Sequence, residues 1–176
     1  MNYGKTVLLL AAIPLLAAPV IAHNDRHEGP AREFRADLRG RNEVPLTLSG
    51  ARGTLALSVN DADTSVHFVL EFSGLQTPVL FSHIHVGQPN VNGGVTVFFC
   101  GGGGRPACPQ GAGTVEGDFT ASNVIALATQ QLEANNLAKL LRAIRAGKTY
   151  ANLHTQTSPG GEIRGQIHAE EREGDR

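Results

Sequence analysis

The 176-residue sequence contains no Trp, one Met, two Cys and only 5% aromatic residues. Charged residues make up 18% and nearly cancel, with a formal net charge of −1, so the basic surface that nucleic-acid binding requires is missing. There is no G-x-S-x-G motif, and covalent catalysis therefore has little support. The 21 Gly and 41% apolar residues favour a single turn-rich β domain and argue against a disordered chain.

The longest apolar run lies at the N-terminus. Lys5 precedes a run that ends in small residues, which predicts a secretory signal peptide over residues 1–22 with cleavage after Ala22. Pro14 and Pro19 interrupt the run, which is too short for a comfortable membrane span. We therefore expect a secreted or periplasmic protein without a membrane span after cleavage, and a polar leader over residues 23–32.

The two cysteines agree with export. Cys100 and Cys108 enclose a glycine-rich segment and, in an oxidising compartment, are expected to form a local disulfide. A metal-thiolate pair is the alternative, but the spacing is not the C-x-x-C of zinc sites.

Most of the chain alternates apolar and polar residues, which is typical of half-buried strands. Short segments of this kind follow one another with turn residues between them, so residues 33–168 are predicted to form one antiparallel, Greek-key-like β-sandwich. The period becomes helical near residues 130–146, where Leu132 to Ile144 form an apolar stripe that ends before Gly147. Residues 169–176 form a charged tail.

Three histidines are the leading candidates for a metal site. Strand parity places Val79, Phe81, His83 and His85 on one face of a strand, and His154 belongs to a later strand. Three imidazoles can hold copper or zinc. The alternative is that these rings only bind loop carbonyl groups and hold the sandwich together. His67 and His168 are expected on solvent-facing surfaces.

Four polar residues are candidates for contacts to a ligand beside these histidines: Tyr150, Asn152, Glu162 and Arg164. Tyr150 and Asn152 share a strand face with His154. Glu162 and Arg164 are expected to form a half-exposed ion pair, with each other or with Asn42 and Glu43, unless they contact an anionic or polar ligand.

Four segments occur in an order that resembles a known family: LRGRNEVP, SHIHVG, FFCGGGGRPACP and GKTYANLHTQTSPGGEIRGQI. Together they are similar to the CHRD domain, a module named after chordin and widespread in secreted bacterial proteins. The resemblance spans about Glu33 to His168 and implies a secreted β-sandwich domain. For bacterial members it implies no settled activity.

A fainter resemblance is to copper-zinc superoxide dismutases, β-sandwiches with a His-x-His strand, a later copper-binding histidine and an arginine beside the copper. It implies copper ligands at His83, His85 and His154 and a guiding role for Arg164. The histidine that bridges copper and zinc and the zinc ligands have no counterparts, which argues against a dismutase.

These observations lead to two hypotheses. The first is an exported, non-enzymatic module that binds an unidentified ligand or protein outside the cytoplasm. The alternative is a metalloprotein that binds copper or zinc, with or without redox activity.

Overall fold

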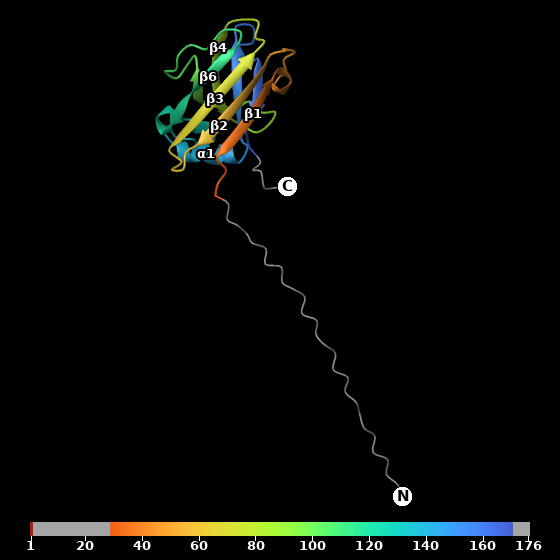
Figure 1. The fold of residues 1–176 in the computed structure, drawn as a ribbon, viewed down its shortest axis with the longest axis vertical. Coiled ribbons are helices and arrows are strands. Elements are labelled where there is room, and N and C mark those ends of the chain that lie inside the picture. Colours follow the sequence, from red (N-terminus) through yellow and green to blue (C-terminus); the bar gives the residue numbers. More distant parts are fainter. Residues whose placement is uncertain (2–28, 171–176) are drawn as a thin grey trace.

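The computed structural model describes Met1 and residues 29–170 (Figure 1). The predicted signal peptide, most of the polar leader and most of the charged tail lie outside these residues. The strands are β1 (Glu33–Arg39), β2 (Arg52–Val59), β3 (Ser65–Ser73), β4 (Val79–Val86), β5 (Gly94–Cys100), β6 (Gly113–Thr120), β7 (Thr149–Thr155), β8 (Ile163–Gln166) and β9 (His168–Ala169). The helices are the short 3-10 turns η1 (Gly40–Asn42), η2 (Ala121–Asn123) and η3 (Ala128–Gln130) and the α-helix α1 (Leu137–Arg145).

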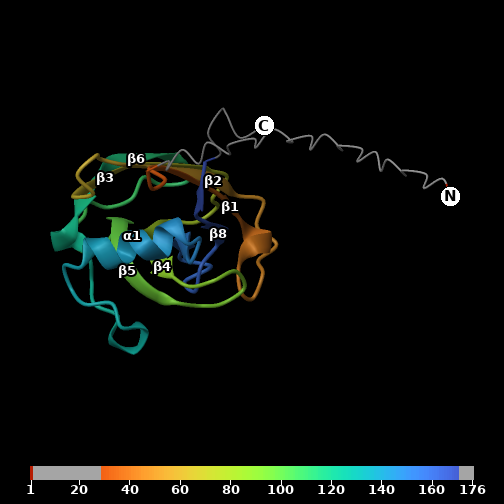
Figure 2. The same ribbon diagram turned by 90° about the horizontal axis from the view of Figure 1, so that it is seen from below.

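The strands form one antiparallel sheet in the order β5-β4-β7-β8-β1-β2-β3-β6, with β9 paired to β1. The sheet folds over on itself, so that β1, β2, β3 and β6 form one layer opposite β4 and β5, with β8 at the side between them (Figure 2). The two ends of the strand order, β5 and β6, approach each other. The fold is therefore an all-β, nearly closed sandwich, as predicted.

Alternation along the strands explains the core. In β3, Val66, Phe68, Leu70 and Phe72 are buried, while the residues between them are at least partly exposed. Strand β7 differs, since all seven of its residues are buried. Its inward side chains, such as Leu153, join the apolar core. The residues of β7 that point away from the core are therefore buried by other segments of the chain. This outer face of the strand carries the candidate site.

The α-helix is shorter than the predicted span of residues 130–146. It begins at Leu137, where the Asn136 side chain caps the backbone N–H of Lys139 at 3.0 Å. Gln131 and Asn135 have positive φ angles of 56° and 61°, which a helix cannot include. The predicted helix was too long because the apolar stripe includes Leu132. This residue is buried, but it forms a β-bridge with Leu127 and does not belong to the helix.

Helix α1 lies across the open end between the two layers (Figure 2). Its buried residues, which belong to the same apolar core as the strands, are Leu137, Leu140, Leu141 and Ile144. Gly147 follows with a φ of 64°, the left-handed conformation that commonly ends a helix.

The predicted disulfide between Cys100 and Cys108 is present. It closes the glycine-rich loop that follows β5. Among the described residues, no helix has the length and apolar character needed to cross a membrane.

Candidate metal site

The three candidate histidines lie on adjacent strands. Strands β4 and β7 pair so that Phe81 lies opposite His154, His83 opposite Asn152 and His85 opposite Tyr150. The neighbours of His83 and His85 in β4, Ser82 and Ile84, are fully buried, and Ile84 belongs to the core. The histidines therefore project from the face of the sheet opposite the core. Val79 was predicted to lie on the same face as these histidines, and this prediction is wrong. It belongs to the core, because the β4–β7 register shifts between Val79 and Phe81.

The three imidazoles converge. Each ring offers one nitrogen, and these nitrogens all lie within 4.8 Å of one another. The ring centroid of His83 is 4.6 Å from that of His85 and 4.6 Å from that of His154. Although they lie outside the core, the three residues are only 2%, 8% and 6% exposed in chain order. The three rings therefore form one cluster, as a shared metal site requires, and this cluster is shielded from solvent.

Backbone carbonyl groups fix the orientation of two of the rings. Nδ1 of His85 lies 2.8 Å from the Gly93 carbonyl oxygen, and Nδ1 of His154 lies 3.0 Å from that of Pro159. Because a carbonyl oxygen only accepts, each Nδ1 carries the proton and each Nε2 holds a lone pair. Metal-binding histidines are oriented by second hydrogen bonds of this kind.

One nitrogen of each ring is buried without a hydrogen-bond partner among the described residues: Nδ1 of His83, Nε2 of His85 and Nε2 of His154. Buried polar atoms without a partner are uncommon and costly, at about 1–3 kcal/mol each. Three of them in one cluster call for an explanation.

The rings are also held in their neutral form. Burial lowers the pKa of His83 to about 2, and the neighbouring His85 and His154 add to this shift. Burial lowers the pKa of His85 to about 4, to which His154 and Arg164 contribute. The pKa of His154 is lowered by burial and by Arg164. The lone pairs are therefore available at neutral pH.

Aromatic rings surround the cluster. Phe81 stacks on His83 with centroids 5.4 Å apart and lies 4.7 Å from His154, while Phe98 meets His83 edge-on at 5.0 Å. On the other side Tyr150 stacks on His85 at 4.5 Å with the planes 7° apart. Phe98 was not recognised in the sequence, because only the pairing of β5 with β4 places it beside His83.

Arg164 and Glu43 form the polar wall of the site. Arg164 donates through Nε to a Glu43 oxygen at 2.8 Å, and the two side chains are only 5% and 2% exposed. The guanidinium lies 4.3 Å from the centre of the Tyr150 ring. The prediction of a half-exposed pair is wrong, since the loop after β1 places Glu43 over Arg164 and excludes water. Asn42 also takes part, donating to the Arg164 carbonyl oxygen at 3.1 Å.

The two remaining candidates have structural contacts. Glu162 does not pair with Arg164; its carboxylate accepts hydrogen bonds from Ser49 at 2.6 Å and Thr155 at 2.5 Å. Asn152 donates to Glu43 at 3.4 Å, which links it to the polar wall.

The loop formed by residues 87–93 covers one side of the site. Arg164 donates to the Val91 carbonyl oxygen at 3.3 Å and to Asn92 Oδ1 at 2.5 Å, and the Gly93 N–H donates to the Tyr150 hydroxyl at 3.1 Å. Arg164 and Tyr150 therefore hold this loop in place over the site. The carbonyl groups of Gly93 and Pro159, which orient His85 and His154, had only one signal in the sequence. This signal was the turn residues that follow the two strands carrying these histidines.

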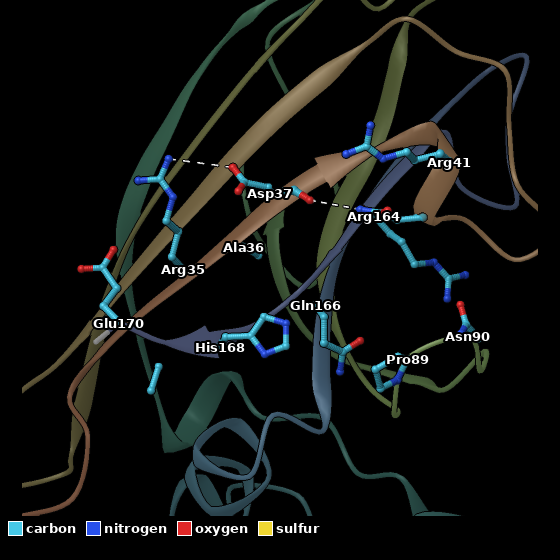
Figure 3. Close-up of a pocket in the computed structure, with 12 residues that line it drawn as sticks. Arg35, Ala36, Asp37, Arg41, Pro89, Asn90, Arg164, Gln166, His168 and Glu170 are labelled. Atoms are coloured by element: carbon cyan, nitrogen blue, oxygen red, sulfur yellow. Dashed lines mark hydrogen bonds and ion pairs between the residues drawn. The ribbon is translucent and has the colours of Figure 1, made fainter. Parts of the chain in front are cut away.

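An open cleft of about 560 Å³ lies next to the polar wall (Figure 3). Arg35, Arg41, Gln166 and His168 line it, together with Asn42 and Arg164 of the polar wall. The histidines themselves do not line it. The three unpartnered imidazole nitrogens belong to the buried cluster and not to the cleft.

The remaining described histidines lie apart from the cluster and on the surface, as predicted. His67 is 44% exposed and contacts Glu116 and Asp118, and His168 is exposed at the rim of the cleft.

Fold and site together define an antiparallel β-sandwich domain with a buried histidine cluster on the outer face of one layer. The chain belongs to the CHRD domain family, whose model matches residues 34–167. CHRD domains are typically extracellular, which agrees with the disulfide. No curated protein matches the chain.

Proposed function

We propose that this chain is an exported CHRD-domain protein that binds one copper or zinc ion between His83, His85 and His154. The observation that carries the proposal is that each ring has one buried nitrogen without a partner and that the three rings converge. A bound cation would satisfy all three lone pairs at once. Imidazole suits both copper and zinc.

The spacing of the rings supports one shared ion. Imidazole nitrogens that bind one ion at about 2.0–2.1 Å lie roughly 3.5 Å apart in a trigonal arrangement. The observed separations, all within 4.8 Å, reach that value after small ring rotations. The fixed Nδ1 protons of His85 and His154 leave the correct nitrogen free on both rings. The ion would supply Lewis-acid or redox chemistry, while the chain's own residues hold it and limit access to it.

The test is metal binding by the purified, exported chain with its disulfide intact. We expect one equivalent of copper or zinc by elemental analysis and one site in calorimetric titration. His83→Ala and His154→Ala should each weaken binding by at least about 10-fold, whereas His168→Ala, on the exposed cleft rim, should not. Variants that only lose stability, in a wild-type protein without stoichiometric metal, would assign the cluster a structural role.

A second candidate function is the binding of an anionic or polar ligand, or a protein partner that presents one, in the cleft of Figure 3. The observation in its favour is that Arg41 lines the cleft and, among the described residues, has no ion pair or side-chain hydrogen bond. Arg41→Ala should weaken such binding and leave the metal affinity unchanged.

Export itself is checked by intact mass. The proposed cleavage after Ala22 gives a mature chain that begins at His23. A secreted or periplasmic product that still carries Met1 would contradict it.

A further inference from the structure

We propose that the histidine cluster prefers monovalent copper over divalent zinc or copper, an inference that rests on the metal-binding function proposed above. Three features carry it: the charge of the donor set, the burial of the site and the number of donors.

The donors are electrically neutral. Among the described residues, the cluster that could hold an ion consists of three histidines and contains no carboxylate or thiolate. The nearest acidic group of the polar wall, Glu43, is already paired with Arg164 at 2.8 Å. The positive charge of a bound ion is therefore not offset by the protein.

The site is also shielded from water. The three residues are 2–8% exposed, and the rings of Phe81, Phe98 and Tyr150 pack against them. The cost of burying an ion rises with the square of its charge, so an uncompensated divalent ion costs about four times as much as a monovalent one. Arg164, which stacks on Tyr150, adds no negative charge to reduce that difference.

The number of donors acts in the same direction. Zinc is almost always bound by four ligands, with water or substrate in the fourth position of an open site. Here Phe81 and Phe98 present apolar rings to the cluster. Monovalent copper, in contrast, accepts three nitrogen donors without a fourth. Sulfur donors do not contribute to the preference, because Cys100 and Cys108 are bonded to each other.

The preference also has a redox consequence. Stabilising the monovalent ion relative to the divalent ion raises the potential for the one-electron reduction of bound Cu(II) to Cu(I). Ascorbate, which donates the electron, should therefore reduce Cu(II)-loaded protein completely and bleach its paramagnetic resonance signal.

The direct test is a competition titration of the disulfide-intact full chain. Anaerobic Cu(I) affinity is measured against a chromophoric Cu(I) chelator, and Zn(II) and Cu(II) affinities are measured with matching chelators. We expect Cu(I) to bind about 100-fold or more tightly than Zn(II) and to displace it. If Zn(II) or Cu(II) binds as tightly as Cu(I) and His83→Ala abolishes that binding, the metal site stands but the preference is overturned. If no ion binds, both proposals are overturned.

A pair of variants tests the physical cause. Phe98 is partly exposed beside His83, and Phe98→Glu places a carboxylate next to the ion, whereas Phe98→Gln has the same length without charge. Phe98→Glu should shift the preference toward Zn(II) by about 10-fold relative to Phe98→Gln. Equal preferences in two folded variants would contradict the charge argument, and the wild-type titration decides the proposal if either variant fails to fold.

Discussion

At the scale of single residues, the unusual feature is how much polarity the outer face of β4, β7 and β8 buries. Glu43 and Arg164 form an ion pair with almost no solvent contact. Burial raises the pKa of Glu43 even though the Arg164 guanidinium and its hydrogen bond act in the opposite direction. Such a pair depends on having both partners, because either one alone leaves a buried charge uncompensated.

Glu43→Ala should therefore lower the free energy of unfolding by about 3–5 kcal/mol. Asp37→Ala, which removes an exposed ion pair with Arg35 at 3.8 Å, should cost no more than about 1 kcal/mol. Urea denaturation measures both. Adding Arg164→Ala to Glu43→Ala should recover part of the loss, and strict additivity of the two changes would show that the pair is not coupled.

The buried imidazoles make the metal-free protein sensitive to acid. The folded-state pKa values of His83 and His85, about 2 and about 4, lie below the ordinary value of 6.5. As the pH falls below 6.5, the unfolded chain takes up protons that the folded chain does not, so stability is lost down to about pH 4 on account of His85 and down to about pH 2 on account of His83. Each such histidine contributes a slope of about 1.4 kcal/mol per pH unit.

Denaturation of the metal-free protein between pH 7 and pH 5 measures this slope. His83→Gln cannot titrate and should reduce the slope by the contribution of one histidine. The carboxylates with lowered pKa values, Asp63 and Glu133, act only at lower pH, since their ordinary values are 3.8 and 4.5. An unfolding free energy that stays constant from pH 7 to pH 5 would contradict neutral, buried rings.

At the scale of elements, the strands were predictable from their alternation, because each exposes one face to the core and the pattern is local. The helix was predictable only in part. Its periodicity located Leu137 to Ile144, but Leu132 follows the same spacing from an irregular segment. The pairing of β4 with β7 and the position of Glu43 over Arg164 depend on segments far apart in the chain, which no local pattern specifies.

Two residues of α1 test its role in closing the core. Leu140 is completely buried and Arg142, in the same helix, is exposed. Leu140→Ala should cost about 2–5 kcal/mol, because it leaves a cavity under the helix, and Arg142→Ala should change stability by less than about 0.5 kcal/mol. Chemical denaturation compares them. Similar effects of the two substitutions would mean that the helix does not seal the end of the sandwich.

At the scale of the whole molecule, the site connects segments that are distant in sequence. Its rings come from β4 and β7, Phe98 from β5, and its polar wall from β8 and the loop after β1. These segments become adjacent only when β5, β4, β7, β8 and β1 have paired in the sheet. Metal affinity and global folding are therefore expected to be coupled, since the unfolded chain has no preformed site.

This coupling predicts that metal raises the stability of the entire domain. An ion that binds only the folded chain, at a free concentration 100 times its dissociation constant, adds about 2.7 kcal/mol to the free energy of unfolding. Thermal unfolding followed by circular dichroism should thus shift upward by several degrees on adding copper, in proportion to the logarithm of its concentration. His154→Ala should abolish the shift, while His67→Ala, on the opposite layer in β3, should keep it. A shift of the same size in the His154→Ala variant would place the ion elsewhere on the chain.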